Sequence, residues 1–136
     1  MTQAISNLAV LLSRMEPVLN AGVYAYACVP HGTALGHIPV VATMQEREGL
    51  TVIVTEAQAL QLGLTVLFRC AWITLNVHSD LNAVGLTAAF AAALGDAGIS
   101  CNVVAGAYHD HLFVPVESAA QALNALTNLQ NQGAIG

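Results

Sequence analysis

The sequence predicts an α+β fold of two ferredoxin-like subdomains, in which helices cover one face of antiparallel sheets. Residues 70–130 show the order strand, helix, strand, strand, helix. The first half of the chain supplies three further strands and a helix. Hydrophobic residues make up 56% of the 136 residues and charged residues only 8%, a composition that excludes disorder and indicates a substantial core.

The first half begins with apolar side chains at helical spacing over residues 5–12, which predict a short amphipathic helix. Three strands are expected next, over residues 23–30, 38–44 and 49–54. Pro39 indicates that the second of these is an edge strand or starts late. A short helix then begins after Thr55, its expected N-cap, and ends at Gly63.

The second half opens with an apolar run that predicts a strand over residues 70–78. Capping residues predict the start of the next helix, which stops at Gly98. These capping residues are Ser79, Asp80 and Asn82. Residues 100–107 and 111–116 predict a hairpin, and residues 118–130 a final helix with Ser118 as its cap.

The net charge of −5 argues against nucleic acid and anionic membranes as partners. The chain has no lysine, and its three arginines, Arg14, Arg47 and Arg69, form no basic stripe. A run of about 20 apolar residues, which a membrane span requires, is absent from the sequence. The N-terminus carries its arginine after its apolar run, unlike a secretory signal, so we expect a cytoplasmic protein.

The cysteines and the apolar excess lead to two further expectations. Cys28, Cys70 and Cys101 are odd in number and lie in apolar, strand-like segments, so we expect reduced thiols. A chain of this size cannot bury so many apolar residues alone. We therefore expect a homodimer or a higher homo-oligomer.

Residues 78–115, HSDLNAVGLTAAFAAALGDAGISCNVVAGAYHDHLFVP, resemble a bacterial family of small tandem ACT-like proteins. They also resemble the regulatory ACT domains of aspartokinases, where a strand, a glycine-containing loop, a helix, a GI turn and a hairpin ending near FVP recur. CVPHG and QEREGLTVIV in the first half resemble the same small family. The resemblance implies a degenerate N-terminal ACT-like subdomain over residues 1–66, a C-terminal one over 67–131 and a tail over 132–136.

The resemblance also implies that an amino acid or similar small effector binds between ACT units. The aspartokinase catalytic domain has no counterpart here, so we expect a regulatory protein that is not an enzyme and needs no cofactor. The loop from His78 to Gly85 delivers the chain into a helix whose first amides, near Ala83 to Leu86, have no intrahelical partners and can bind a carboxylate. Asp80 could hold an ammonium group.

Gly85 is expected in the first helical turn, where its missing side chain would leave room for a ligand. The helix propensity of valine is no worse than that of glycine, so a Gly85→Val protein is expected to fold. The alternative is that Ser79 or Asp80 merely caps the helix and that Gly85 serves helix packing. With the resemblance, ligand binding is favoured. The expected ligand-binding residues are His78, Ser79, Asp80, Leu81, Asn82, Ala83, Val84, Gly85, Leu86, Tyr108, His109, Asp110 and His111.

The turn YHDH raises the question of a metal site, because two histidines flank an aspartate. A structural zinc site needs four ligands and a catalytic one three, so further side chains would have to converge on His109 and His111. Candidates are His78, His31, His37 or a cysteine. The favoured interpretation is a polar hairpin tip, in which Asp110 bonds the turn backbone and the histidines contact the loop of His78 or a neighbouring subunit.

The sequence therefore favours a regulatory protein that binds a small, amino acid-like effector. One alternative is a structural or interaction module without a ligand. The other is a metal-binding protein that uses His78, His109 and His111.

Overall fold

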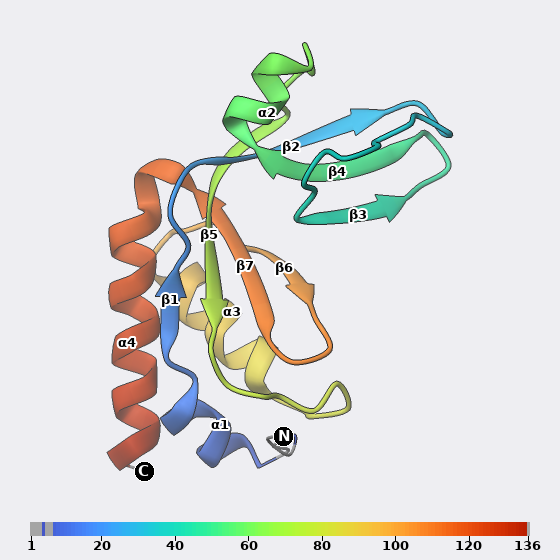
Figure 1. Ribbon diagram of the computed structural model, residues 1–136. Coiled ribbons are helices and arrows are strands. Elements are labelled where there is room, and N and C mark those ends of the chain that lie inside the picture. Colours follow the sequence, from blue (N-terminus) through green and yellow to red (C-terminus); the bar gives the residue numbers. More distant parts are fainter. Residues whose placement is uncertain (1–3, 5–6, 136) are drawn as a thin grey trace. The chain divides into compact units, whose positions relative to one another are not determined.

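The computed structural model describes residue 4 and residues 7–135, and the chain divides into two compact units. Unit 1 comprises Met1–Asn20 and Trp72–Gly136, and unit 2 comprises Ala21–Ala71. Strand β5 (Phe68–Leu75) runs from unit 2 into unit 1 (Figure 1). The N-terminal segment thus groups with the second half of the chain.

Unit 2 contains an antiparallel arrangement of strands in the order β3-β4-β2-β5. Its elements are β2 (Tyr24–Val29), β3 (Ala42–Gln45), β4 (Leu50–Thr55) and helix α2 (Glu56–Gln61). The three predicted strands and the helix are confirmed. Strand β3 starts late, at Ala42, and lies at the edge of this order, as Pro39 indicated.

The core of unit 2 follows from alternation along β2 and β4. Ala25 pairs with Val54 and Ala27 with Val52, so these buried side chains share one face. Ala59 of α2 is fully buried in the same cluster. Helix α2 therefore packs on this face of the two strands.

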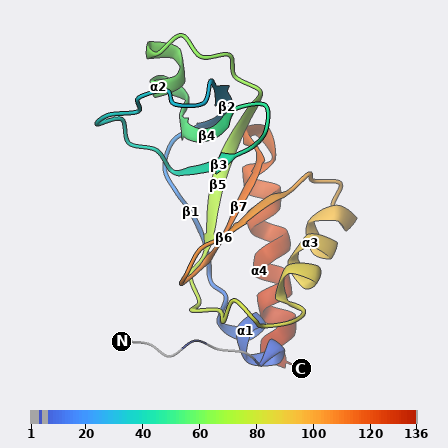
Figure 2. The same cartoon turned by 90° about the vertical axis from the view of Figure 1, so that its right-hand side faces the viewer.

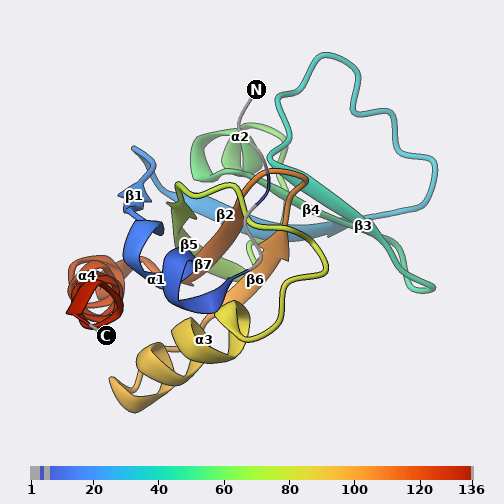
Figure 3. The same cartoon turned by 90° about the horizontal axis from the view of Figure 1, so that it is seen from below.

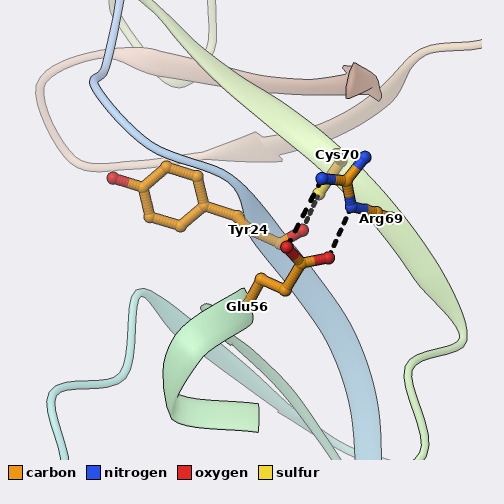
Figure 4. Close-up of polar contacts among 4 residues, drawn as sticks. All are labelled: Tyr24, Glu56, Arg69 and Cys70. Carbon is orange, nitrogen blue, oxygen red and sulfur yellow. Dashed lines mark hydrogen bonds and ion pairs between the residues drawn. The ribbon is translucent and has the colours of Figure 1, made fainter. Parts of the chain in front are cut away.

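Polar contacts hold the N-terminal end of α2 in unit 2. The Thr55 side chain accepts a hydrogen bond from the Gln58 amide at 3.2 Å, which confirms Thr55 as the N-cap. Glu56, the next residue, forms an ion pair with Arg69 of β5 (Figure 4). The Cys70 thiol lies 3.5 Å from the Tyr24 carbonyl oxygen, and burial raises the pKa of Cys70 to about 11.

In its described part, unit 1 contains strands in the order β1-β5-β7-β6, accompanied by three α-helices. The predicted order strand, helix, strand, strand, helix is confirmed in residues 68–135, and strand β1, which pairs with β5, is an addition that the sequence did not predict. The elements are α1 (Leu8–Arg14), β1 (Pro17–Leu19), α3 (Leu86–Asp96), β6 (Asn102–Ala105), β7 (Asp110–Pro115), the 3-10 turn Val116–Ser118 and α4 (Ala119–Ile135).

Two element boundaries in unit 1 differ from the predictions. Strand β5 ends at Leu75 instead of residue 78, and α3 begins at Leu86, well after the predicted capping residues. Residues 76–85, between β5 and α3, form an irregular loop.

Helices α1 and α4 also differ from their predicted ranges. Helix α1 begins at Leu8, whereas residues 5 and 6 of the predicted helix lie outside the described part of the chain. Residues 132–135, predicted as a tail, continue α4. Contacts with α1 explain the extension, since the Gln130 side-chain amide donates to the Ser13 carbonyl at 3.2 Å and Gly133 lies directly against Leu12.

The helices α3 and α4 of unit 1 lie on one face of its strands (Figure 2), and α1 lies beside α4 (Figure 3). Between helices and strands are fully or almost fully buried side chains, among them Leu86, Phe90, Leu94, Leu112, Val114 and Leu126. The antiparallel sheet with helices on one face confirms the predicted α+β class. Within the described residues, no helix is both long and apolar enough to cross a membrane.

Candidate functional site

The loop between β5 and α3 and the turn between β6 and β7 meet in unit 1 and line a small pocket. Its volume is about 70 Å³. Both segments were predicted as ligand-binding, and the structure brings them together. The lining residues are Ser79, Asp80, Leu81, Ala83, Leu86, Thr87, Ala105, Gly106, His109 and Asp110.

The loop residue Asp80 organises its own backbone. Its Oδ1 accepts a hydrogen bond from the Asn82 amide at 2.9 Å, and its carbonyl accepts one from the Ala83 amide at 2.9 Å. This is the turn geometry that aspartate side chains favour. The Ser79 amide donates to the Tyr108 carbonyl at 3.2 Å and so ties the loop to the β6–β7 turn.

The prediction that Ser79, Asp80 and Asn82 cap helix α3 is wrong. Gly85 is the N-cap, with a φ of 103°, and no side chain caps the helix. Ser79, Asp80 and Asn82 lie too early in the chain to do so, because the loop is longer than the sequence indicated. The Ala83 amide, expected to be available, is bonded to Asp80.

The amides without intrahelical partners are therefore those of Leu86, Thr87 and Ala88. The first bond inside the helix runs from the Ala89 amide to the Gly85 carbonyl at 2.9 Å. Leu86 and Thr87 both line the pocket. A helix N-terminus of this kind favours a negatively charged group.

Across the pocket, the β6–β7 turn is held by two hydrogen bonds. The Gly106 amide donates to the His109 carbonyl at 2.9 Å, and His109 Nδ1 lies 3.0 Å from the Val77 carbonyl oxygen. Since a carbonyl only accepts, Nδ1 of His109 carries the proton. The sequence predicted that both histidines contact either the loop of His78 or a neighbouring subunit. His109 contacts Val77, the residue before His78, whereas His111 contacts β5.

Asp110 is the buried polar residue of the pocket, with a relative exposure of 9%. Burial raises the pKa of its carboxyl group, while the neighbouring His111 and His109 act in the opposite direction. Asp110 lies at the start of β7, opposite Ala105. A bound cation would favour the charged form of this carboxylate.

Six of the predicted residues do not line the pocket. The rings of His78 and Tyr108 pack on each other with centroids 4.9 Å apart, and His111 lies on the opposite face of β7 from Asp110. Thr87, Ala105 and Gly106 were missed. The six predicted residues outside the lining are His78, Asn82, Val84, Gly85, Tyr108 and His111.

The metal-site alternative lacks a ligand set. Among the residues that the structure describes, no three His, Cys, Asp or Glu side chains come together where they could hold a metal ion. His78, His109 and His111 therefore form no such group. A pair of ligands is too few for the zinc sites considered from the sequence.

A larger groove of about 510 Å³ lies between α1 and α4 of unit 1. The described residues that line it include no ionisable side chain, so they offer no charged partner for a small zwitterion. The residues are Asn7, Leu8, Ala9, Leu12, Leu129, Gln132 and Gly133. The smaller pocket is the better candidate because it combines carboxylates with helix amides.

Comparison with known proteins places the fold and the family. Two ACT domain models match the chain, one over residues 3–71 and the other over residues 67–128. No curated protein matches it. Among solved structures, a Vibrio cholerae protein, VC0802, described as of unknown function and a possible transport protein, is 46% identical, with a TM-score of 0.82 over 90% of this chain and 95% of that one.

Two more distant structures share the fold alone. Protein Atu0741 from Agrobacterium tumefaciens is 18% identical, with a TM-score of 0.71 over 86% of this chain and 90% of that one. The regulatory subunit of aspartate kinase from Thermus flavus is 14% identical, with a TM-score of 0.61 over 83% of this chain and 95% of that one. Together with the matching family models, the fold shows that this chain belongs to the ACT domain family and carries two ACT domains in tandem.

Proposed function

We propose that this protein is a regulatory ACT protein that binds a small amino acid, with the charged head group of the amino acid in the pocket of unit 1. One observation carries the proposal: the pocket combines the uncapped N-terminus of α3 with the carboxylates of Asp80 and Asp110. The amides of Leu86 and Thr87 would receive the carboxylate of the effector. Asp80 and Asp110 would receive its ammonium group.

The pocket volume limits what can enter. At about 70 Å³ it is well below the roughly 300–1,000 Å³ of sites that enclose a drug-sized ligand. The head group would fill it and the side chain of the effector would lie outside. Exposed apolar residues on the same two segments could cover that side chain, namely Leu81, Val84 and Tyr108.

These exposed residues also support a homodimer, in which a second copy would cover the open side of the pocket. As part of the same proposal, the two ACT domains divide near residues 66 and 67, next to residues 67–71, where the matches to the two family models overlap. A structural module without a ligand is the competing function. It differs in one measurable respect, which is the response to amino acids.

The experiment is a thermal-shift screen of the protein against the common amino acids and against matched carboxylic acids without the amine, such as alanine and propionate. An effector at 100 times its dissociation constant stabilises the native state by about 2.7 kcal/mol. The proposal predicts a shift with an amino acid and a smaller one with its matched acid. No shift with any amino acid would favour the structural module.

Asp80→Asn provides the matched control variant. Asparagine keeps the Oδ1 that accepts from the Asn82 amide at 2.9 Å, so the loop turn survives, but it removes the negative charge. Affinity for the amino acid should fall by roughly tenfold, the equivalent of one charge-assisted hydrogen bond. Affinity for the matched acid should stay the same. Equal losses for both ligands would show that Asp80 does not contact the ammonium group.

A further inference from the structure

On the face of β7 away from the pocket, His111 makes two close contacts with β5. Its Nδ1 lies 3.0 Å from the indole nitrogen of Trp72 and 3.1 Å from the hydroxyl oxygen of Thr74. The other side of the ring faces the β6–β7 turn, where a Cβ on Gly106 would stand 3.2 Å from His111 Nε2. His111 thus fills the space between β5 and the turn.

These contacts determine where the imidazole carries its proton. An indole N–H only donates, so the Nδ1 atom that receives it carries no hydrogen. His111 is therefore neutral, with its proton on Nε2. The Thr74 hydroxyl accepts from the Asn20 side-chain amide at 3.0 Å, which leaves its own hydrogen free to donate to the same Nδ1.

We propose that His111 is a proton-operated switch, in which uptake of one proton from water at Nδ1 breaks the Trp72 hydrogen bond and loosens the β6–β7 turn from β5. The Thr74 hydroxyl can rotate and accept from the new N–H. The indole of Trp72 cannot, because it has no lone pair to offer. One proton therefore replaces the hydrogen bond between Trp72 of β5 and His111 of β7 with two N–H groups that face each other.

The surroundings of His111 set the pH at which its imidazole takes up the proton. Burial lowers the pKa of His111 from 6.5, the neighbouring His109 lowers it further, and Asp110 raises it. The neighbouring strands present Trp72 and Thr74 from β5 and Val104 from β6, none of which titrates. The switch should therefore operate on the acidic side of pH 6.5.

The first test uses Trp72, which is the only tryptophan in the sequence. A protonated imidazole beside an indole quenches its fluorescence, so the native protein should show one quenching transition with a midpoint below pH 6.5. His111→Asn retains an acceptor near the Nδ1 position and cannot titrate there, so the transition should disappear. His109→Asn is the control: the transition should remain and move to higher pH.

The second test reads the imidazole directly by nitrogen NMR. Its first measurement uses the native protein and so does not depend on the folding of a variant. His111 should carry its proton on Nε2 at neutral pH. Trp72→Phe, which keeps an aromatic ring but removes the indole donor, should raise the pKa of His111. A proton on Nδ1 at neutral pH, or the same fluorescence transition in a folded His111→Asn protein, would overturn the proposal. Neither test involves an effector, so the outcome is separate from that of the proposed function.

Discussion

Replacing Gly85 with alanine should destabilise unit 1, because this residue begins α3 with a φ of 103°. A non-glycine residue in such a conformation costs about 1–3 kcal/mol. Alanine recovers about 0.4–1 kcal/mol by restricting the unfolded chain. The added Cβ would also stand 2.9 Å from Leu8 Cδ2, but that side chain is 37% exposed and its end can shift. The net expectation is a loss of about 1–2 kcal/mol.

Gly95→Ala in the same helix is the matched control. Gly95 lacks a positive φ, and a Cβ there would meet nothing within 4 Å. Alanine should raise the stability by about 0.5–1 kcal/mol at this exposed helical position. Both variants are compared by thermal unfolding followed by circular dichroism, where each kcal/mol moves Tm by several degrees. A Gly85→Ala protein as stable as Gly95→Ala would refute the conformational argument.

Four further substitutions test how individual side chains contribute to the stability of the fold. Asp110→Asn should raise Tm at neutral pH, because burial raises the pKa of this carboxyl and so disfavours its charged form. The gain in Tm over the native protein should shrink as the pH falls through the raised pKa towards 3.8. A lower Tm than that of the native protein at neutral pH would contradict this. His111 contributes stability that is complete above pH 6.5 and is lost as the pH falls towards its lowered pKa, so His111→Asn should flatten pH-dependent unfolding in that range. Gly133→Ala should cost about 1–3 kcal/mol, since its Cβ would stand 2.6 Å from Leu12 Cβ, and hydrogen exchange should show a loosened α1. Glu56→Gln should cost no more than about 1 kcal/mol in urea unfolding, because the Arg69 side chain of this ion pair is 53% exposed.

Much of the fold could be predicted from the sequence because local signals and packing agree. The alternation in residues 23–30 and 49–54 predicts strands, and the structure pairs the small and branched side chains of these strands on one face. Thr55 caps α2 as its position indicated. The ACT family, expected from the resemblance of residues 78–115, is confirmed by the family models.

The start of α3 could not be predicted from local propensity. Ser79, Asp80 and Asn82 are good capping residues, and the apolar spacing continues through the loop, so a helix from residue 80 was a reasonable prediction. The positive φ of Gly85 decides the boundary, and a single sequence carries no direct sign of it. Glycine is an acceptable N-cap, and that was the only available hint.

The candidate site was predicted in its two segments but not in its geometry. Alternation on β7 separates Asp110 from His111, and placing the turn one residue differently exchanges their faces. The contacts of Trp72 and His111 depend on strand order, since 39 positions separate the two residues in the chain. Long-range pairings of this kind cannot be derived from periodicity alone.

The most direct measurement of the central claim is the response of the backbone amides to amino acids in nitrogen–proton NMR spectra of the full chain. On titration with the common amino acids, the amides of Leu86 and Thr87 should move saturably, together with those of Asp80 and His109, and the matched carboxylic acids should cause smaller changes. Unmoved amides at the start of α3, or shifts confined to the groove between α1 and α4, would contradict the proposed effector site.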